Sequence, residues 1–411
     1  KYPDIIYAGP VVDDVRVLNH SRVSDGVILA RLNVEKGKPI DVDRIERNIG
    51  RIYGLELFES VYYDITTESG QNVLTVSARE NSWGPNYLQF GVVVYEDYEG
   101  PNLNVAVAYT RTAVNRLNGE WRTGIQIGQE PGIFTQFFQP FDHRLRKFGV
   151  IQLFVGEEAW NVFDGEGNKV SELGLRRYGV DLALGRELGT WGEFRAGVLR
   201  EAGTINIQVG DPDTPDSDFD TGEIYLQFFL DELDDVRFPG EGGALRVRAT
   251  AGLEELGSDV NYEQGTARGS LAYSIGRNTG FFSGLFETTR DSDAPVQNLY
   301  RLGGFTRLSG FELNELTGQN ATLLSALFYR LMRRSSLVPF YAGLSLEYGN
   351  VFQDRDEIKW DNGIVAGSGF LGLDTPVGPV YVAYGFAEGG RRNFYLILGQ
   401  SLGFHRAGFW N

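Results

Sequence analysis

The 411-residue chain has no cysteine, one methionine and three histidines. Without cysteine it can form neither disulfide bonds nor cysteine-ligated metal sites. A formal net charge of -17, with no Lys/Arg-rich stripe, argues against a nucleic-acid partner, because a phosphate backbone is bound by clustered positive charge. No stretch approaches the roughly 20 uninterrupted apolar residues of a membrane-spanning helix. These absences exclude helical membrane insertion, but they leave open both a soluble protein and a membrane β-barrel.

Glycine and aromatic residues are abundant instead. The chain holds 53 Gly, 27 Phe and 20 Tyr, which indicates many short strands and tight turns. Its mean hydropathy of -0.23 does not argue against a membrane barrel, because barrel strands alternate lipid-facing with lumen-facing residues. The length predicts one large unit and a smaller one.

The smaller unit is predicted over residues 11–81, where helical and strand periods are mixed. We expect a strand over 11–18, a short helix capped by Ser24, a second helix capped by Asp41 and ended by Gly54, and strands over 60–66 and 73–79. The apolar residues of the second helix recur at helical spacing and predict one buried stripe. A generic small α+β domain fits this order.

After Trp83 the apolar period becomes two and remains so, as in Leu88, Phe90, Val92 and Val94. Turn signals predict about sixteen antiparallel strands in one closed transmembrane barrel over residues 82–411, with a soluble multi-sheet protein as the alternative. The strands are expected near 86–97, 103–115, 119–130, 132–142, 149–163, 170–188, 190–209, 220–232, 244–256, 266–277, 279–289, 321–333, 337–351, 363–373, 377–387 and 391–404. The tail 405–411 follows.

Two segments resemble a known family. Glu35-Lys36-Gly37-Lys38-Pro39 between the predicted helices, the run from Gly54 to Val61 and Leu74-Thr75-Val76 resemble a POTRA domain. A loop of about thirty residues, 290–320, contains Leu302-Gly303-Gly304-Phe305-Thr306-Arg307-Leu308-Ser309-Gly310-Phe311. This loop resembles the sixth extracellular loop of the BamA, TamA and FhaC superfamily, which implies that it folds into the barrel lumen.

In that superfamily an arginine of the loop pairs with an acidic residue on the thirteenth strand. Here Ser309 stands at the arginine position, between Leu308 and Gly310. The alternation of the thirteenth strand turns Glu347 inward, at the acidic position. We hypothesise that Arg307 pairs with Glu347, because a buried charge requires a partner. Two separately solvated charges are the alternative.

A single POTRA domain, this loop and sixteen strands together resemble the patatin-like type Vd autotransporters. The resemblance implies an outer-membrane translocator and anchor, with the POTRA domain in the periplasm and residues 1–10 as the linker from a missing patatin-like lipase passenger. Implied partners are that passenger, outer-membrane lipids and the barrel-assembly machinery, with a homodimer possible. The alternatives are a two-partner secretion transporter, a barrel-assembly factor acting on separate proteins, and a passive pore or anchor.

Catalysis and cofactor binding are not expected in this chain. The Gly-x-Ser-x-Gly pattern of serine hydrolases occurs only at Gly399 to Gly403, inside a predicted barrel strand and not in a strand-to-helix turn. The histidines, His20, His143 and His405, lie in the predicted POTRA segment, a turn and the tail. An acidic loop could bind Ca²⁺ through oxygen ligands, but the spacing is not that of an EF-hand, and a solvated loop is expected. Its carboxylates are Asp211, Asp213, Asp216, Asp218 and Asp220.

Overall fold

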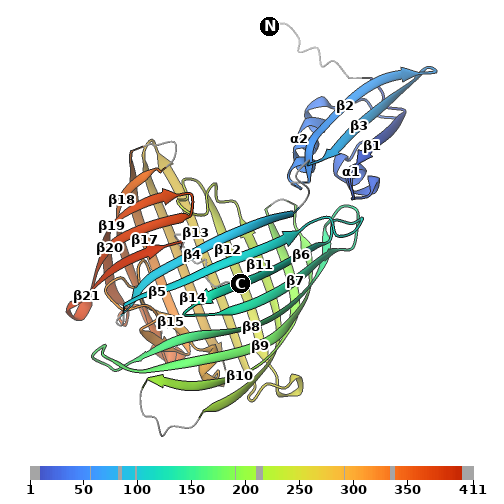
Figure 1. Cartoon of the computed structure of the whole chain (residues 1–411). Coiled ribbons are helices and arrows are strands. Elements are labelled where there is room, and N and C mark those ends of the chain that lie inside the picture. The colour runs from blue at the N-terminus through green and yellow to red at the C-terminus, as the bar shows by residue number, and fades with distance from the viewer. Residues whose placement is uncertain are drawn as a thin grey trace. The chain divides into compact units, whose positions relative to one another are not determined.

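The computed structural model describes residues 10–55, 57–81, 86–97, 100–189, 191–209, 216–290, 292–333 and 338–399, and Figure 1 shows its elements. None of the helices among these residues is both long and apolar enough to span a membrane. The chain folds into a small α+β domain and a large closed barrel. Residues 1–9 and the tail 405–411, including His405, lie outside the described residues.

The N-terminal domain has the predicted strand-helix-helix-strand-strand order. Its elements are β1 (Asp14–His20), α1 (Asp25–Leu32), α2 (Val42–Tyr53), β2 (Phe58–Glu68) and β3 (Gln71–Glu80). The sheet order is β1-β3-β2, with β1 parallel to β3 and β2 antiparallel to it. The predicted cap Asp41 accepts a hydrogen bond from the Arg44 N–H at 2.9 Å, whereas the Ser24 side chain makes no cap hydrogen bond. Asp41 therefore stabilises the start of α2.

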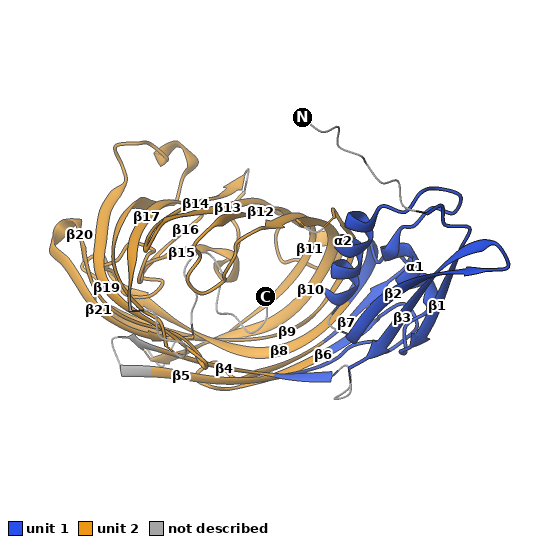
Figure 2. Ribbon diagram, turned by 90° about the horizontal axis from the view of Figure 1, so that it is seen from above, with its two compact units in different colours: residues 1–88, 109–122, 136–150 blue, residues 89–108, 123–135, 151–411 orange. Residues whose placement is uncertain are grey.

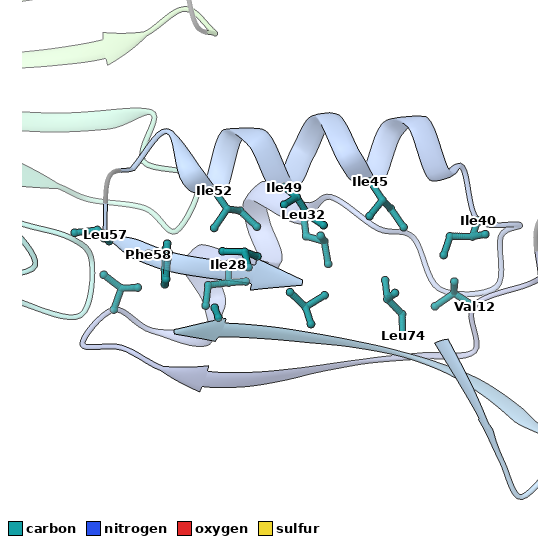
Figure 3. Close-up of a cluster of buried hydrophobic side chains, with 14 of the residues drawn as sticks. Val12, Ile28, Leu32, Ile40, Ile45, Ile49, Ile52, Leu57, Phe58 and Leu74 are labelled. Carbon is teal, nitrogen blue, oxygen red and sulfur yellow. The ribbon is translucent and has the colours of Figure 1, made fainter. Parts of the chain in front are cut away.

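The core of this domain lies between the helices and the sheet. Figure 3 shows Ile45, Ile49 and Ile52 of α2 side by side along the helix face that the sequence predicted to be buried. Leu74 of β3 faces the helices from the sheet and is fully buried. The helical spacing of the three isoleucines thus provides the apolar face that attaches α2 to the sheet.

The barrel closes through sixteen strands, as predicted, and Figure 2 views the ring from above. Each predicted strand range overlaps an observed strand. The barrel strands are β4 (Asn86–Asp97), β5 (Gly100–Arg111), β6 (Glu120–Gly128), β7 (Gly132–Pro140), β8 (Lys147–Phe163), β9 (Lys169–Glu187), β10 (Gly192–Val209), β11 (Ser217–Asp231), β12 (Gly242–Gly252), β13 (Tyr262–Ile275), β14 (Asn278–Arg290), β17 (Asn320–Arg333), β18 (Phe340–Phe352), β19 (Ile364–Thr375), β20 (Gly378–Ala387) and β21 (Arg391–Leu398). Two short strands, β15 (Tyr300–Leu302) and β16 (Leu316–Gly318), lie between β14 and β17 in the chain and are not part of the barrel wall.

Side chains alternate across the barrel wall. On β18, Leu344 and Leu346 are 66% and 63% exposed on the outer face, whereas Ser345 and Glu347 are 9% and 1% exposed on the inner face. A strand presents successive side chains to opposite faces, so the period of two predicted which residues line the lumen. Glu347 points inward, as expected from the sequence.

The barrel closes between β21 and β4. Within the described residues this contact consists of the pairs Ile397↔Tyr95 and Leu398↔Val94. In comparison, β20 and β21 form eight pairs, from Val380↔Leu398 to Ala387↔Arg391. β21 ends at Leu398, and the remainder of the strand predicted to reach residue 404 is outside the described residues after Gly399.

Candidate functional site: a loop inside the barrel

The long loop between β14 and β17 is the candidate site. We call residues 292–319 the lumen loop. It contains a 3-10 turn, Val296–Asn298, and a small antiparallel sheet formed by β15 (Tyr300–Leu302) and β16 (Leu316–Gly318). In Figure 2, β15 and β16 lie inside the ring of barrel strands. The structure thus places β15 and β16 of this loop inside the barrel.

Ser309 attaches the loop to the barrel wall. Its backbone N–H donates to Oε2 of Glu347 at 2.6 Å, and its hydroxyl donates to Oε1 at 2.7 Å. The Ser345 hydroxyl also donates to Oε1, at 2.5 Å. Ser309 is fully buried and Glu347 is 1% exposed. A desolvated carboxylate is costly unless its oxygens are hydrogen-bonded, and here three donors from neutral groups satisfy it.

The hypothesised ion pair between Arg307 and Glu347 is wrong. Among the ion pairs of the described residues none joins these two side chains, and the Arg307 guanidinium donates to the Arg301 carbonyl at 2.7 Å. The reason is the direction of the loop backbone, which brings the N–H and hydroxyl of Ser309 to the carboxylate. Arg307 instead braces the loop against its own strand β15.

Gly310 brings the loop backbone against β20 and β21. A Cβ on Gly310 would lie 2.7 Å from the backbone nitrogen of Ala387, and φ of this glycine is +111°. Its N–H donates to the Tyr395 hydroxyl at 2.7 Å, and that hydroxyl donates to the Phe311 carbonyl at 2.6 Å. Only glycine combines this close approach with this backbone conformation at no steric cost.

The loop also contacts the opposite wall. The guanidinium of Arg301 on β15 lies 3.5 Å from the ring centroid of Trp160 on β8, a cation–π contact. The Asn298 amide donates to Oε1 of Glu223 on β11 at 3.0 Å, and the Tyr262 hydroxyl donates to the same oxygen at 2.6 Å. The lumen loop therefore spans the barrel from β18 and β21 to β8 and β11.

Part of the loop backbone is strained. Thr306 and Leu308 have φ of +62° and +74°, a region that costs a non-glycine residue about 1–2 kcal/mol. Leu308 is fully buried and directly precedes Ser309. The packing around Leu308 and the hydrogen bonds of Ser309 offset that strain and hold the turn in one conformation.

The other residues considered from the sequence lie elsewhere. Asp218 accepts a hydrogen bond from the Thr204 hydroxyl at 2.8 Å, and Asp220 pairs with Arg200 at 2.5 Å. Asp216 is exposed next to them, while Asp211 and Asp213 are outside the described residues. The described residues contain no group of three or more side chains that could hold a metal ion. His20 ends β1 and His143 lies in the turn between β7 and β8.

Several residues of the site were not identified from the sequence, among them Tyr395 and Trp160. Tyr395 alternates with Phe394 and Leu396, which are exposed on the outer face, so the period of β21 is the signal that indicates its inward direction. Trp160 similarly lies on a predicted strand, but nothing local indicates a contact with a loop 140 positions later in the chain. Such a pairing is a property of the tertiary structure alone.

The Ser309 hydroxyl lies beside the Glu347 carboxylate, and both groups are buried where the loop meets the wall. Residues 136–402 match the Omp85 superfamily domain. No curated protein sequence matches the chain. The solved structure of BamA from Haemophilus ducreyi lacking POTRA domains 1-3 is similar, with a TM-score of 0.73 and 12% identity, over 94% of this chain and 83% of that one.

Two further solved structures are similar in fold. CdiB from Acinetobacter baumannii has a TM-score of 0.62 and 10% identity, over 95% of this chain and 74% of that chain. CdiB from Escherichia coli has a TM-score of 0.62 and 13% identity, over 95% and 76%. Because the family match covers more than half of the sequence, the chain belongs to the Omp85 superfamily of outer-membrane β-barrel transporters.

Proposed function

We propose that this chain is the translocator of a type V secretion protein, which exports a polypeptide linked to its own N-terminus. The observation that carries the proposal is the barrel itself, whose lumen is occupied by a loop held through Ser309 and Glu347. A lumen that is filled at rest suits a transporter that must not leak, because a displaced loop opens a path and a docked loop closes it.

The N-terminal domain is proposed to be a POTRA domain in the periplasm. Two observations support this identity: its strand-helix-helix-strand-strand order, and the similarity to a BamA structure that lacks POTRA domains 1-3. That similarity covers 94% of the present chain, so it must extend into residues 11–81. The proposed role of the domain is to guide an unfolded passenger by adding it as a strand to a sheet edge.

The contact between β21 and β4 is the proposed opening. It has two residue pairs within the described residues, whereas β20 and β21 have eight. Opening a barrel exposes backbone N–H and C=O groups, and each costs several kcal/mol in lipid unless a substrate strand replaces the lost partner. Among the described pairs, separating β21 from β4 breaks fewer than separating β20 from β21, and therefore costs less.

The passenger is proposed to be a patatin-like phospholipase encoded upstream of Lys1, carrying a Ser–Asp dyad. This part rests on the resemblance of the lumen loop and the single N-terminal domain to the patatin-like autotransporters. Reading the full gene tests it directly, since an upstream segment without such a dyad would reject the patatin passenger and leave the translocator to be tested separately.

Engineered disulfides test the opening. The chain has no native cysteine, so Val94→Cys with Leu398→Cys creates a single pair across the β21–β4 contact. The control, Val382→Cys with Leu396→Cys, joins β20 to β21, which the proposal keeps together. An epitope-tagged reporter fused before Lys1 is followed by protease accessibility on intact cells. We expect the first lock to stop surface exposure until a reductant is added, and the control lock to leave it unchanged.

Export that continues under the first lock would contradict opening at this contact. The principal alternative is a transporter that acts on separate proteins, which the fold similarity to CdiB and BamA favours. Supplying the tagged reporter on a separate chain distinguishes the two functions. Surface exposure only of the fused reporter supports the autotransporter, and exposure of the separate reporter supports the alternative.

A further inference from the structure

The turn between β11 and β12 carries an aromatic residue into the barrel. Residues 232–241 fold inward at the barrel end where β4 begins, since alternate strands of an antiparallel barrel stop at the same end. Phe238 of this turn is 6% exposed and contacts three tyrosines of the wall, Tyr329 on β17, Tyr341 on β18 and Tyr381 on β20. We call these three tyrosines the aromatic box.

The box holds the phenylalanine ring by geometry that aromatic pairs favour. The Phe238 ring is stacked on Tyr341, with centroids 4.1 Å apart and an interplanar angle of 9°. It meets Tyr329 edge-on with centroids 6.2 Å apart, and it is tilted by 44° against Tyr381 with centroids 5.3 Å apart. Gly372 of β19 forms the floor, because a Cβ there would lie 2.9 Å from two atoms of the Phe238 ring. The box is therefore shaped for a flat ring.

The tyrosine hydroxyls bind the backbone on both sides of that ring. The Tyr381 hydroxyl donates to the carbonyl of Arg237 at 3.1 Å, and the Tyr329 hydroxyl donates to the carbonyl of Pro239. These contacts recognise a peptide backbone irrespective of the side chains that it carries. The tyrosines of the wall thus bind one aromatic ring together with the carbonyl groups of the residues before and after it.

A carboxylate recognises the preceding residue. The Arg237 guanidinium pairs with Asp374 at 2.7 Å and donates to the carbonyl of Thr375 at 3.3 Å. Both acceptors lie at the end of β19, beside the aromatic box. The wall residues therefore match a basic residue followed by an aromatic one, a pair that occurs in many unfolded polypeptides.

We propose that the aromatic box, Gly372 and Asp374 form a peptide-binding site for an unfolded polypeptide that carries a basic-aromatic pair, and that Arg237-Phe238-Pro239 is its built-in occupant. The proposal rests on the proposed transport function for the source of the polypeptide. An entering chain displaces the turn by offering the same ring, the same carbonyl groups and the same positive charge.

The site also contacts the lumen loop. Phe305 of the loop packs against Tyr381 at 5.5 Å and against Tyr395 at 6.2 Å, so Tyr381 lies between the rings of Phe238 and Phe305. Tyr395 in turn holds Gly310 of the loop. A substrate residue that displaces Phe238 therefore changes the surroundings of Tyr381, whose ring packs against Phe305 of the lumen loop.

Peptide binding to the purified full-length chain in lipid nanodiscs tests the site. The probe is a fluorescent Gly/Ser-rich dodecapeptide with a central Arg-Phe-Pro, and its control has Arg-Ala-Pro. We expect weak binding to the wild type and at least tenfold tighter binding of the Phe probe to Phe238→Ala, because that change vacates the box. Val236→Ala is the matched control, since Val236 lies on the same turn but is 49% exposed.

Further variants separate the site from nonspecific adsorption. In the Phe238→Ala background, Gly372→Ala should abolish the gain, and Asp374→Asn should weaken the Arg-Phe-Pro probe while leaving a Gln-Phe-Pro probe unchanged. Phe238→Leu, which preserves apolar volume for folding, should give an intermediate gain. Equal binding of the Phe and Ala probes, or no gain in either Phe238 variant, would overturn the proposal. The assay requires no export, so its result is independent of the transport experiments.

Discussion

Ser309 donates two hydrogen bonds to Glu347, one from its backbone N–H at 2.6 Å and one from its hydroxyl at 2.7 Å. Hydrogen bonds to a charged acceptor are roughly twice as strong as neutral ones, and these two lie in a fully buried part of the lumen. They attach the centre of the lumen loop to β18. The loop is therefore held through a carboxylate and neutral donors.

The coupling between these two residues can be measured. In a double-mutant cycle of Ser309→Ala and Glu347→Gln, we expect a coupling free energy of about 1–2 kcal/mol, since the hydroxyl donates to a charged group. The measurement is the urea midpoint of the barrel refolded in lipid. The matched cycle pairs Arg307→Gln with Glu347→Gln, and we expect coupling near zero there. Strong coupling in the second cycle alone would instead support an ion pair between Arg307 and Glu347.

Gly310→Ala is predicted to destabilise the docked lumen loop. Gly310→Ala places a Cβ 2.7 Å from backbone atoms of β20, which cannot move without disturbing the wall. Gly389→Ala is the control, because it too has a positive φ, +78°, but nothing lies within 4 Å of its Cβ. We expect the control to lose about 1 kcal/mol of stability from backbone strain and Gly310→Ala to lose clearly more. Equal losses would refute the close approach.

Trp160 is predicted to hold the loop against β8. A desolvated cation–π contact contributes about 2 kcal/mol, so Trp160→Ala should speed hydrogen exchange in β15 and β16 by about thirtyfold. Trp360→Ala provides the comparison, since Trp360 is 82% exposed in the loop between β18 and β19. Unchanged exchange in Trp160→Ala, measured by mass spectrometry, would mean that the contact contributes nothing to docking.

The N-terminal domain is predicted to lose stability in acid. A hydrogen bond from Lys36, together with its charge, lowers the pKa of Asp14 from its ordinary value of 3.8. Lys38 similarly lowers the pKa of Glu35 from 4.5. A carboxyl whose pKa is lower in the folded state stabilises the fold above its ordinary pKa, and this contribution disappears as the pH falls through the lowered pKa.

Lys36→Gln tests this dependence. We expect slightly lower protection of β1–β3 from hydrogen exchange than in the wild type at pH 6–7, and no difference once the pH has fallen through the lowered pKa of Asp14 and its carboxyl is protonated. The effect should be small because both side chains are exposed to solvent. Arg47→Gln, on the exposed face of α2, serves as the control. A Lys36→Gln difference that persisted at low pH would assign it to something other than Asp14.

Much of the architecture followed from the sequence because its determinants are local. The period of two placed every barrel strand near its observed position and turned Glu347 inward. The isoleucines at helical spacing predicted the buried face of α2. The loop was recognised by its length and its Leu-Ser-Gly-Phe core. Strand alternation, helix capping and turn formation depend on a few neighbouring residues, so they can be predicted from the sequence before the tertiary structure is known.

The partner of Glu347 depended on the path of the lumen loop. Charge reasoning selected Arg307, but positive φ angles at Gly303, Gly304 and Leu308 turn the backbone so that Ser309 meets the carboxylate. The occupation of the aromatic box by Phe238 is equally nonlocal, since it joins a turn to strands about 90 to 140 residues later in the chain. A barrel with an inward acidic residue and a long loop could be predicted from local sequence patterns. The donors that meet across the lumen could not, because those contacts join chain segments that are distant in sequence and near in space.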